Sequence, residues 1–397
     1  MAWKLAIPGS GGSTPVVAGS TAYLTAGAPG EPDPRGKSKE PPAAMNYLLA
    51  IDLETGELKW KTPIGIDRGG KHRKGSGSNP SPVTDGEHIY CYFRSGDLAC
   101  VDIDGHVQWH TNIQVLFGRD SLWWDLGTSP LLTPDSVVIA VMQTGPSFLV
   151  AFDKKTGQRK WKADRSVKAP LEAAQSYTTP VAVAVNNKPA IAVMGADHLT
   201  LNQRDNGQLI GQLGGFNPGE EEYFRSISSP AAEGHVIVCP YARGETLTGV
   251  DMNALADGKG DQSILWFRDD LGSDVPTPAI DQGTVYVVSD GKATRGRVSA
   301  LDLMTGKTKW DLQLPKSRLG YSSSPLVAGN HLYAVQEDGT TFVVGPLDAG
   351  QPELVATNQL ADDQQFTVAS PVPLPTVTGQ GDLLLRTKGF LHRISAR

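Results

Sequence analysis

The stretch Ala300–Trp310, ALDLMTGKTKW, reads as a strand, a tight turn and a second strand that ends in a tryptophan. The Asp302 side chain can accept hydrogen bonds from the turn amides, and Gly306 can supply the positive φ that such a turn needs. Similar stretches are AIDLETGELKW ending at Trp60, CVDIDGHVQW ending at Trp109 and AFDKKTGQRKW ending at Trp161. A strand-turn-strand unit therefore recurs along the chain.

A Ser-Pro or Thr-Pro pair precedes each of these units. The pairs end at Pro15, Pro82, Pro130, Pro180, Pro230, Pro278, Pro325 and Pro371, with a first interval of 67 residues and later intervals of 46 to 50. Two apolar runs joined by a Gly-containing turn follow each pair, as in SPVTDGEHIYCYF from Ser81. Four strands in each of eight units indicate blades around a central channel. We predict one all-β domain over residues 1–397, an eight-bladed β-propeller.

The two ends of the chain complement each other. The last unit, from Ser370, has three strand-like runs and no final tryptophan, whereas the N-terminal AWKLAI carries Trp3. We expect this N-terminal strand to complete the last blade and so remove open sheet edges. Two other units lack the tryptophan, NQRDNGQLIGQ from Asn202 and GPLDAGQPEL from Gly345. We expect something smaller to fill the seam between blades there.

The Asp-x-x-Thr-Gly-x-x-x-Trp signature of residues 52–60, 153–161 and 302–310 resembles the repeat of the PQQ-like propellers. This family includes the quinoprotein alcohol dehydrogenases and the outer-membrane assembly lipoprotein BamB. The resemblance covers nearly the whole chain and implies the propeller fold. It implies no single function, because the family contains both enzymes and non-catalytic scaffolds.

Composition and charge narrow the classes of partner. A net charge of -6 argues against a general attraction to nucleic acid or to anionic membranes, so any anion site would be local. No apolar run approaches the roughly 18 residues of a membrane span. The start MAWKLAIPGSGG has no signal-peptide pattern, which predicts a cytoplasmic protein if the sequence is complete and a periplasmic or exported one if a signal was removed. We expect a monomer.

Polar and aromatic residues surplus to the repeat are predicted to ring one mouth of the channel. They precede the Ser/Thr-Pro pairs or occupy the loops between second and third strands: Asn79, Trp123, Trp124, Asp125, Tyr177, His198, Arg225, Tyr241, Arg243 and Asp274. The stretch KHRKGSGSN from Lys71 adds His72, Arg73 and Lys74, which could hold an anionic group or form a solvated loop. Trp123 and Trp124 are interpreted as a ligand-stacking platform, or as rings that cap the channel or pack beneath a loop. Asp125, Arg225 and Asp274 are candidate ligand contacts or a structural ion-pair network.

Three functions fit this pattern. The first is a small-molecule or protein ligand bound at the mouth, for example a sugar-like or anionic molecule held by aromatic faces and arginines. The second is a PQQ- and calcium-dependent dehydrogenase, implied by the resemblance, with Asp125 or Asp274 as general base and Arg225 or Arg243 at the quinone. The third is a BamB-like scaffold with the proline-rich loop Gly27–Ala44 at its rim. Because no two cysteines are adjacent, the dehydrogenase is not favoured, and neither cofactor is assigned.

The three cysteines leave the redox compartment open. Counting outward from a two-residue turn at Ser95 and Gly96 places Cys91 opposite Cys100, where a disulfide is conceivable and free thiols are the alternative. A disulfide would favour an oxidising compartment. The histidine spacing predicts no zinc site, and no metal is assigned to particular residues.

Overall fold

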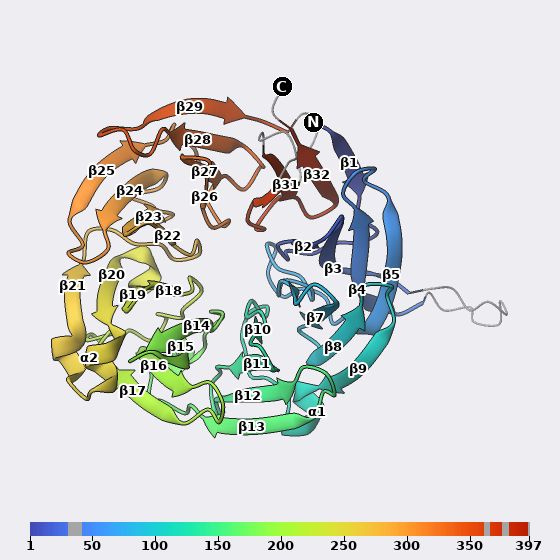
Figure 1. Ribbon diagram of the computed structural model, residues 1–397, viewed down its shortest axis with the longest axis horizontal. Helices are drawn as coiled ribbons and strands as arrows, with labels where there is room; N and C mark the ends of the chain where they lie inside the picture. Colours follow the sequence, from blue (N-terminus) through green and yellow to red (C-terminus); the bar gives the residue numbers. More distant parts are fainter. Residues whose placement is uncertain (31–41, 361–365, 375–380, 396–397) are drawn as a thin grey trace. The chain divides into compact units, whose positions relative to one another are not determined.

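In the computed structural model, residues 1–30, 42–360, 366–374 and 381–395 are described. These residues form eight four-stranded sheets, and in seven of them the four strands are consecutive along the chain (Figure 1). The eighth sheet has the order β1-β32-β31-β30 and so combines the first strand with the last three. The eight sheets are the blades of an eight-bladed β-propeller, which confirms the predicted fold class.

Short strands build each blade in the described part of the chain. The first four blades contain β2 (Val16–Ala18), β3 (Thr21–Pro29), β4 (Ala44–Asp52) and β5 (Leu58–Ile66); β6 (Val83–Thr84), β7 (His88–Tyr92), β8 (Asp97–Asp102) and β9 (Val107–Asn112); β10 (Leu131–Leu132), β11 (Ser136–Val141), β12 (Phe148–Asp153) and β13 (Arg159–Asp164); β14 (Val181–Val185), β15 (Lys188–Gly195), β16 (His198–Gln203) and β17 (Leu209–Leu213).

The other four blades follow the same scheme. They contain β18 (Ala231–Glu233), β19 (Val236–Tyr241), β20 (Thr246–Asp251) and β21 (Ile264–Arg268); β22 (Ala279–Asp281), β23 (Thr284–Val288), β24 (Arg297–Asp302) and β25 (Thr308–Gln313); β26 (Leu326–Ala328), β27 (His331–Val335), β28 (Thr341–Gly345) and β29 (Glu353–Asn358); β30 (Val372–Leu374), β31 (Asp382–Arg386), β32 (Phe390–Ile394) and β1 (Trp3–Ala6). Helical segments interrupt some connections: α1 (Ile113–Phe117), α2 (Met252–Ala256), η1 (Leu171–Ala174), η2 (Ala242–Gly244) and η3 (Gly260–Ser263).

The N-terminal strand completes the last blade, as predicted. β1 pairs antiparallel with β32, with Trp3 opposite Arg393 and Ala6 opposite Phe390. Both ends of the chain therefore contribute to one sheet. The pairing of β1 with β32 covers a strand edge that would otherwise be open.

Close packing divides the chain into two compact units. The first unit comprises Met1–Val137, Phe152–Gln158 and Val372–Arg397, and the second comprises Val138–Ala151 and Arg159–Pro371. Each has its own apolar cores between sheets. One core in the first unit includes Tyr23, Leu48, Ile89, Phe93 and Val101, and one in the second includes Tyr286, Val298, Trp310, Tyr321 and Phe342.

The signature tryptophan and the signature glycine meet across neighbouring blades. Trp60 Nε1 donates a hydrogen bond to the Ile103 carbonyl, at 3.0 Å, and its ring covers Gly105. A Cβ on Gly105 would lie 2.9 Å from that ring, and its φ of +93° also favours glycine. The same arrangement joins Trp3 to Gly56, Trp109 to Gly157 and Trp266 to Gly306. The repeat therefore carries both halves of each blade-to-blade contact.

Where the fourth blade lacks its tryptophan, a helix from the next blade fills the seam. The side chain that packs there, Leu255, is smaller than an indole, as predicted, but the helix that carries it was not predicted. Asp251 caps α2 by accepting hydrogen bonds from the amides of Asn253 and Ala254, at 2.9 and 3.1 Å. Leu255 on this helix is 2% exposed and packs beside Gly211 of β17, where a Cβ would lie 3.2 Å from its side chain. The long insertion in the fifth unit thus replaces a missing indole.

The Ser/Thr-Pro pairs form a chain of hydrogen bonds between blades. In the first unit the Thr14 amide donates to Ser81 Oγ, and the Ser81 amide donates to Ser129 Oγ, each at 2.9 Å. In the second unit the same bond links Thr179 to Ser229, Ser229 to Thr277, Thr277 to Ser324 and Ser324 to Ser370. The motif therefore needs a hydroxyl residue before the proline because its side chain accepts the neighbouring blade's amide.

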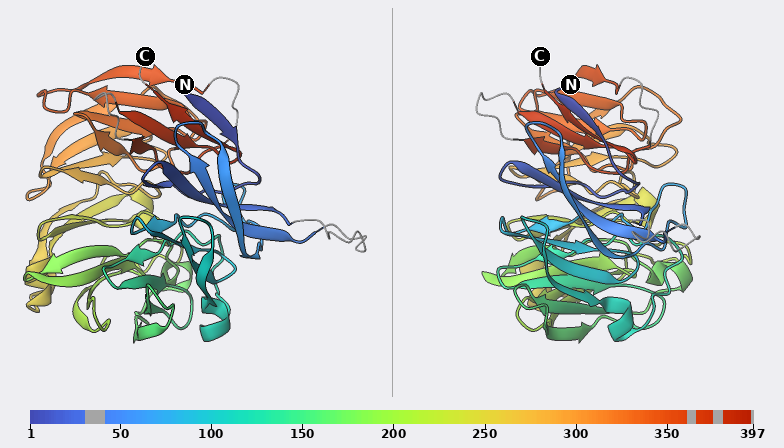
Figure 2. Two further views of the ribbon diagram at one scale, coloured as in Figure 1. Left: turned by 45° about the vertical axis from the view of Figure 1, so that its right-hand side comes forward. Right: turned by 90° about the vertical axis from the view of Figure 1, so that its right-hand side faces the viewer.

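One sequence expectation about a loop is corrected. The segment Gly27–Ala44 was expected to be one long loop, but β3 continues to Pro29 and β4 begins at Ala44, and Figure 2 shows the two strands side by side. Residues 31–41 of that segment lie outside the described residues.

In the part of the chain that the structure describes, no helix combines the length and the apolarity that crossing a membrane requires.

The disulfide geometry predicted for Cys91 and Cys100 was wrong. Cys91 pairs with Ala99, and Cys100 pairs with Tyr90, because a three-residue turn joins β7 and β8 instead of a two-residue one. Gly96 in this turn has a φ of +91°. A shift of one residue places the two cysteines on opposite faces of the sheet. Cys91, Cys100 and Cys239 are buried free thiols.

Candidate functional site

The residues predicted for the channel mouth fall into two groups, one in each compact unit. The first unit holds His72, Arg73, Lys74, Asn79, Trp123, Trp124 and Asp125, and the second holds Tyr177, His198, Arg225, Tyr241, Arg243 and Asp274. A single mouth lined by both groups stays a prediction. Within each unit, contacts show which of these residues come together.

Asp125 anchors the glycine-rich loop that follows β5. Its carboxylate accepts hydrogen bonds from the amides of Lys71, at 2.7 Å, and His72, at 2.9 Å. Arg94 Nη1 lies 3.6 Å from the same carboxylate. Asp125 is only 7% exposed. In the stretch predicted to hold an external anion, these two amides are therefore occupied by an internal carboxylate.

Further contacts fix this loop to its surroundings. Lys71 Nζ donates to the Leu122 carbonyl, and Arg94 Nη1 donates to the Gly69 carbonyl. Burial and the nearby Arg94 lower the pKa of the Lys71 ammonium, although Asp120 and Asp125 act in the opposite direction. We call Lys71, His72, Arg94, Trp124 and Asp125 the Asp125 cluster.

The two adjacent tryptophans are held in solvent beside this anchor. Trp123 is 43% exposed and Trp124 is 42% exposed, so neither ring is buried beneath a loop. The His72 ring meets the Trp124 ring edge-on, with centroids 5.6 Å apart. His72 Nδ1 accepts a hydrogen bond from the Lys74 amide, at 3.3 Å. Two large aromatic surfaces thus stand next to a cationic loop whose backbone is tied down.

Helix α1 is joined to the same region through Gln114. Arg68 Nη1 donates to Gln114 Oε1, at 2.6 Å, and Gln114 Nε2 donates to the Arg94 carbonyl, at 2.9 Å. Gln114 Nε2 also donates to the Asp120 carboxylate. Asn112 caps the helix through the amides of Gln114 and Val115, both at 3.0 Å. Gln114 was not predicted from the sequence, because an amide within an apolar run has no motif to identify it.

In the second unit the charged residues neutralise one another. Arg225 makes a two-pronged pair with Asp274, at 2.7 and 2.9 Å, and its Nε lies 4.0 Å from Glu172. Arg243 Nη2 lies 3.4 Å from the other oxygen of Glu172 and its Nε donates to the Tyr223 carbonyl, at 2.8 Å. Although burial lowers it, the hydrogen bond and charge of Asp274 and the charge of Glu172 raise the pKa of Arg225 overall.

Asp290 extends this group without having been predicted. Its carboxylate accepts the amides of Asp274, at 2.8 Å, and Val275, at 3.0 Å. Burial raises the pKa of Asp290 to about 6, helped by the charge of Asp274 and opposed by these amides. We call Glu172, Arg225, Arg243, Asp274 and Asp290 the Arg225 cluster. Glu172 and Asp290 lacked any local signal because the fold alone brings them to Arg225 and Asp274.

The remaining predicted residues make local bonds. Tyr177 is 5% exposed and donates to Gln175 Oε1, at 3.2 Å, while Tyr241 is 3% exposed and donates to the Phe224 carbonyl, at 2.9 Å. His198 Nδ1 lies 2.6 Å from the Ala196 carbonyl, and Asn79 Oδ1 accepts from Ser76 Oγ, at 2.8 Å. Lys388 Nζ donates to the Arg73 carbonyl, at 2.7 Å. Both tyrosines therefore offer little surface to a ligand.

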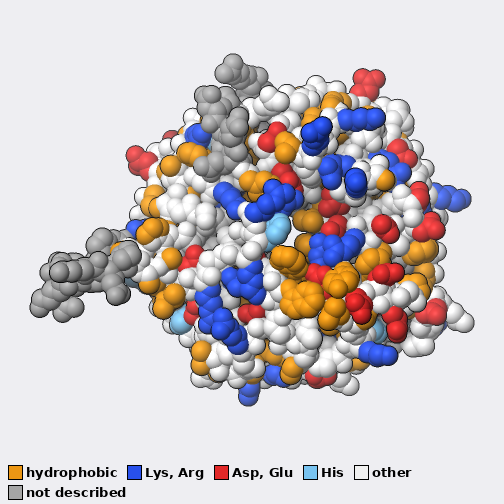
Figure 3. All heavy atoms as spheres, turned by 180° about the vertical axis from the view of Figure 1, so that it is seen from behind, with side chains coloured by type: hydrophobic (Ala, Val, Ile, Leu, Met, Phe, Trp, Pro, Cys, Tyr) orange, Lys and Arg blue, Asp and Glu red, His pale blue; other side chains and the backbone are white. Residues whose placement is uncertain are grey.

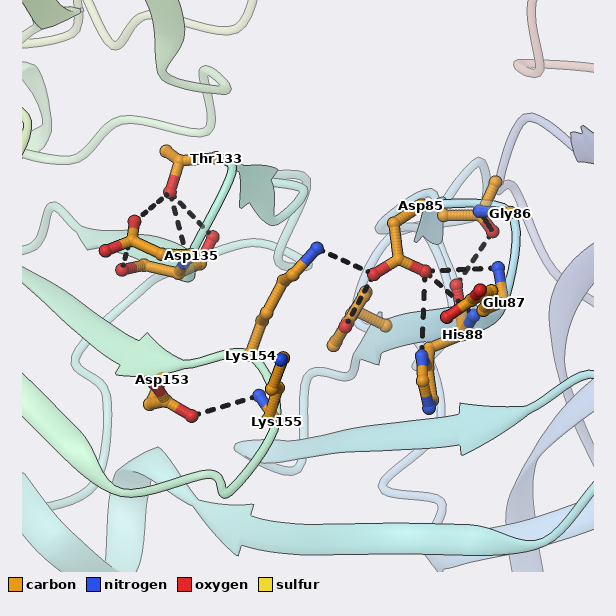
Figure 4. Close-up of polar contacts among 12 residues, drawn as sticks. Asp85, Gly86, Glu87, His88, Thr133, Asp135, Asp153, Lys154 and Lys155 are labelled. Atoms are coloured by element: carbon orange, nitrogen blue, oxygen red, sulfur yellow. Dashed lines mark hydrogen bonds and ion pairs between the residues drawn. The ribbon is translucent and has the colours of Figure 1, made fainter.

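A third charged group lies in the turns that Figure 4 shows. Asp85 accepts hydrogen bonds from Lys154 Nζ and from the His88 amide, both at 2.9 Å. Burial alone would raise the pKa of Asp85, but these bonds and the Glu87 amide lower it to about 2. The pair links the turn before β7 to the turn after β12. Its geometry is that of a structural contact between neighbouring blades.

The carboxylates predicted for calcium or base chemistry do not fit that use as they stand. Asp125 is committed to two amides and Asp274 to both terminal nitrogens of Arg225. A calcium ion needs several oxygen ligands, and a general base needs access to its substrate proton. We therefore derive no step through PQQ or calcium. The arrangement favours binding through exposed cations and aromatic rings. Figure 3 shows Lys and Arg side chains next to hydrophobic ones on one face of the protein.

Similarity to solved structures is broad and low in sequence identity. BamB from Moraxella catarrhalis is 14% identical, covers 89% of this chain and 94% of its own, and has a TM-score of 0.60. A europium-containing methanol dehydrogenase is 13% identical, covers 98% of this chain and 85% of its own, and has a TM-score of 0.69. The quinohemoprotein alcohol dehydrogenase from Comamonas testosteroni is 14% identical, with coverages of 100% and 77% and a TM-score of 0.69. At these identities the likeness shows the fold alone.

A protein-family model identifies the family of the chain, which the solved structures at these identities do not. No curated protein matches the chain. The model described as outer membrane protein assembly factor BamB matches residues 1–123, 44–312 and 232–389, in overlapping segments that span nearly the whole chain. The chain therefore belongs to the BamB family of PQQ-like β-propellers.

Proposed function

We propose that this protein is a non-catalytic binding module that holds an anionic partner through the first unit, in an assembly role like that named for the BamB family. The binding surface consists of exposed side chains of two neighbouring segments, and we call it the loop surface: Arg68, Lys71, His72, Arg73, Arg119, Trp123 and Trp124. In this proposal the protein works in the periplasm.

One observation carries the proposal. Asp125 is buried and bound to two amides, whereas the two tryptophans directly before it are more than two-fifths exposed. Exposing two indoles is costly unless something covers them, and large aromatic side chains beside cations are typical of interface anchors. The anchored backbone would lower the entropy that binding must overcome.

The charges of the loop surface favour an anionic partner. Arg68, Lys71, Arg73 and Arg119 are exposed, whereas Asp67 and Asp120 are only partly exposed. Asp67 accepts a hydrogen bond from the Gly69 amide, at 2.9 Å, and Asp120 from the Leu122 amide, at 3.2 Å. The acidic groups of these segments thus bond to nearby backbone amides. Arg73 and Arg119 are exposed, while Lys71 and Arg68 each also donate a hydrogen bond within the protein. A partner with carboxylate or phosphate groups would meet a locally positive surface on a chain of net charge -6.

Site-specific photo-crosslinking in cells tests the proposal, and it can capture a partner of any identity. A photoreactive phenylalanine analogue in place of Trp124 should give discrete adducts. The same analogue in place of Phe267, which is 58% exposed on β21, is the matched control. Adducts at 124 should disappear when Arg73 and Arg119, which are both exposed, are changed to Glu. Equal adducts at both positions, or none at 124, would contradict the proposal.

A second assay tests the non-catalytic part. The purified protein, supplied with PQQ and calcium, should give no dye-linked oxidation of alcohols above the rate of an Asp125→Asn, Asp274→Asn variant. Sustained turnover that the double variant loses would overturn this part of the proposal and restore the dehydrogenase alternative.

A further inference from the structure

The tip of α1 exposes an apolar surface that the proposed function does not use. Val115 is 83% exposed and Leu116 is 51% exposed, and both lie on a helix whose Ile113 is buried. Isolated exposed aliphatic residues are common, but here two adjacent ones are exposed together on one short helix. We call Val115 and Leu116 the α1 tip.

The α1 tip is attached firmly to the loop surface. Gln114, the residue before Val115, bonds to Arg68 at one side and to the Arg94 carbonyl at the other. Asp120 completes this network by accepting from Gln114. The hydrogen bonds of Gln114 therefore connect α1 to the two segments that carry the tryptophans and the cations of the loop surface.

We propose that this region docks the protein on an anionic lipid bilayer, with the α1 tip and the indoles of Trp123 and Trp124 in the interfacial layer. The proposal rests on the proposed function in sharing the loop surface, and it assigns the anionic groups to lipid headgroups. Tryptophan, arginine and lysine are the side chains that favour the membrane interface, where each presents an apolar part and a polar end.

The exposure of the tip favours a bilayer over an acidic protein segment. Side chains as exposed as Val115 project from the surface, and a fluid bilayer can receive them without a complementary hollow. A protein partner would need a shaped pocket for each. The charge distribution also favours an anionic bilayer. Cations near an anionic surface are attracted to it, and this attraction decays within about 10 Å. Acidic side chains elsewhere on the chain lie farther from the bilayer, so salt would screen their repulsion.

Vesicle flotation tests the proposal with the full chain. The protein should float with vesicles of phosphatidylcholine containing about 30% phosphatidylglycerol, and binding should fall at least about fivefold with phosphatidylcholine alone or at about 0.5 M salt. Val115→Ser with Leu116→Ser should weaken vesicle binding about tenfold, because it removes apolar area that the bilayer would bury. Val355→Ser, at a residue 50% exposed on β29, is the control and should bind like the unchanged protein.

The outcomes separate this proposal from the proposed function. Absence of binding to phosphatidylglycerol vesicles, together with persistent protein adducts at 124, overturns the lipid docking and leaves the partner-binding function standing. Equal losses in the α1 tip variant and the β29 control also overturn it. Vesicle binding that depends on the α1 tip, without protein adducts at 124, supports the lipid docking and contradicts a protein partner.

Discussion

The Asp125 cluster and the Arg225 cluster occupy corresponding places in the repeat but use charge in opposite ways. Asp125, Arg225 and Asp274 each precede a Ser/Thr-Pro pair of their own blade. Asp125 directs its carboxylate to backbone amides and leaves neighbouring cations and indoles exposed. Arg225 instead pairs with Asp274 and approaches Glu172, so its charge is used within the unit.

A charged residue in a propeller loop is therefore not by itself a binding residue. Its role depends on whether its charge is already satisfied by another group of the same protein. In the Arg225 cluster opposite charges satisfy each other, so an external ligand would have to break a two-pronged pair. In the Asp125 cluster the acid is internal and the cations beside it are not all neutralised. We accordingly expect the Arg225 cluster to stabilise the fold and the Asp125 cluster to support binding.

The largest effect is expected from Arg225→Met. The change leaves the carboxylate of Asp274 without its cation and Glu172 with Arg243 alone, and breaking a largely buried pair costs about 3–5 kcal/mol. Urea unfolding measures the loss. Arg204→Met is the control, since its partner Asp205 is on the surface. A loss below about 1 kcal/mol would mean that the Arg225 cluster is not a stabilising network.

A pH-dependent effect of somewhat smaller size is expected from Asp290→Asn. Burial raises the pKa of Asp290 to about 6, so the folded state holds its proton more tightly than the unfolded state does. The resulting stabilisation is present below about pH 4 and is lost as the pH rises through 6. Between these pH values, the free energy of unfolding of the unchanged protein should fall by about 2–3 kcal/mol relative to that of the variant. The free energy of unfolding at pH 4 and 7 checks this, with exposed Asp281→Asn as control, and parallel pH profiles for all three proteins would contradict it.

Asp125→Ala should lower the free energy of unfolding less than the two preceding changes do, but it should weaken the binding of a partner at the loop surface. Two amides lose their acceptor, but the loop is near solvent and water can replace part of the interaction, so we expect about 1–2 kcal/mol. Limited proteolysis should cut the chain near residues 68–74 faster, and adducts at Trp124 should fall. Asp125→Asn, which keeps one acceptor oxygen, should lie between. A loop that resists proteolysis as before would show that Asp125 does not anchor it.

The smallest effect on stability is expected from Trp123→Ala with Trp124→Ala. Both rings are exposed, so the free energy of unfolding should stay within about 0.5 kcal/mol of its original value. Vesicle binding should nevertheless be lost. If the double variant instead loses several kcal/mol, the indoles belong to the fold and the contrast between the two clusters disappears.

The fold was predictable because its signals lie within short stretches of chain. The Asp-x-x-Thr-Gly-x-x-x-Trp signature contains the turn, the glycine and the indole that later meet across blades, as Trp60 and Gly105 do. The closure by Trp3 followed from counting strands. The register at Cys91 was not predictable by counting alone, since one extra turn residue moves every side chain to the other face.

The repeat, the number of blades, the closure of the last blade and the surplus of Trp123 and Trp124 all follow from the amino-acid sequence alone. These features depend on local periodicity and turn chemistry. The three-dimensional arrangement was needed to show that Asp125 faces inward to Lys71 and His72, that Arg225 is matched by Asp274 and Glu172, and that α2 replaces a missing indole. Such pairings join residues up to 54 positions apart, and their partners are selected by packing that no single stretch encodes.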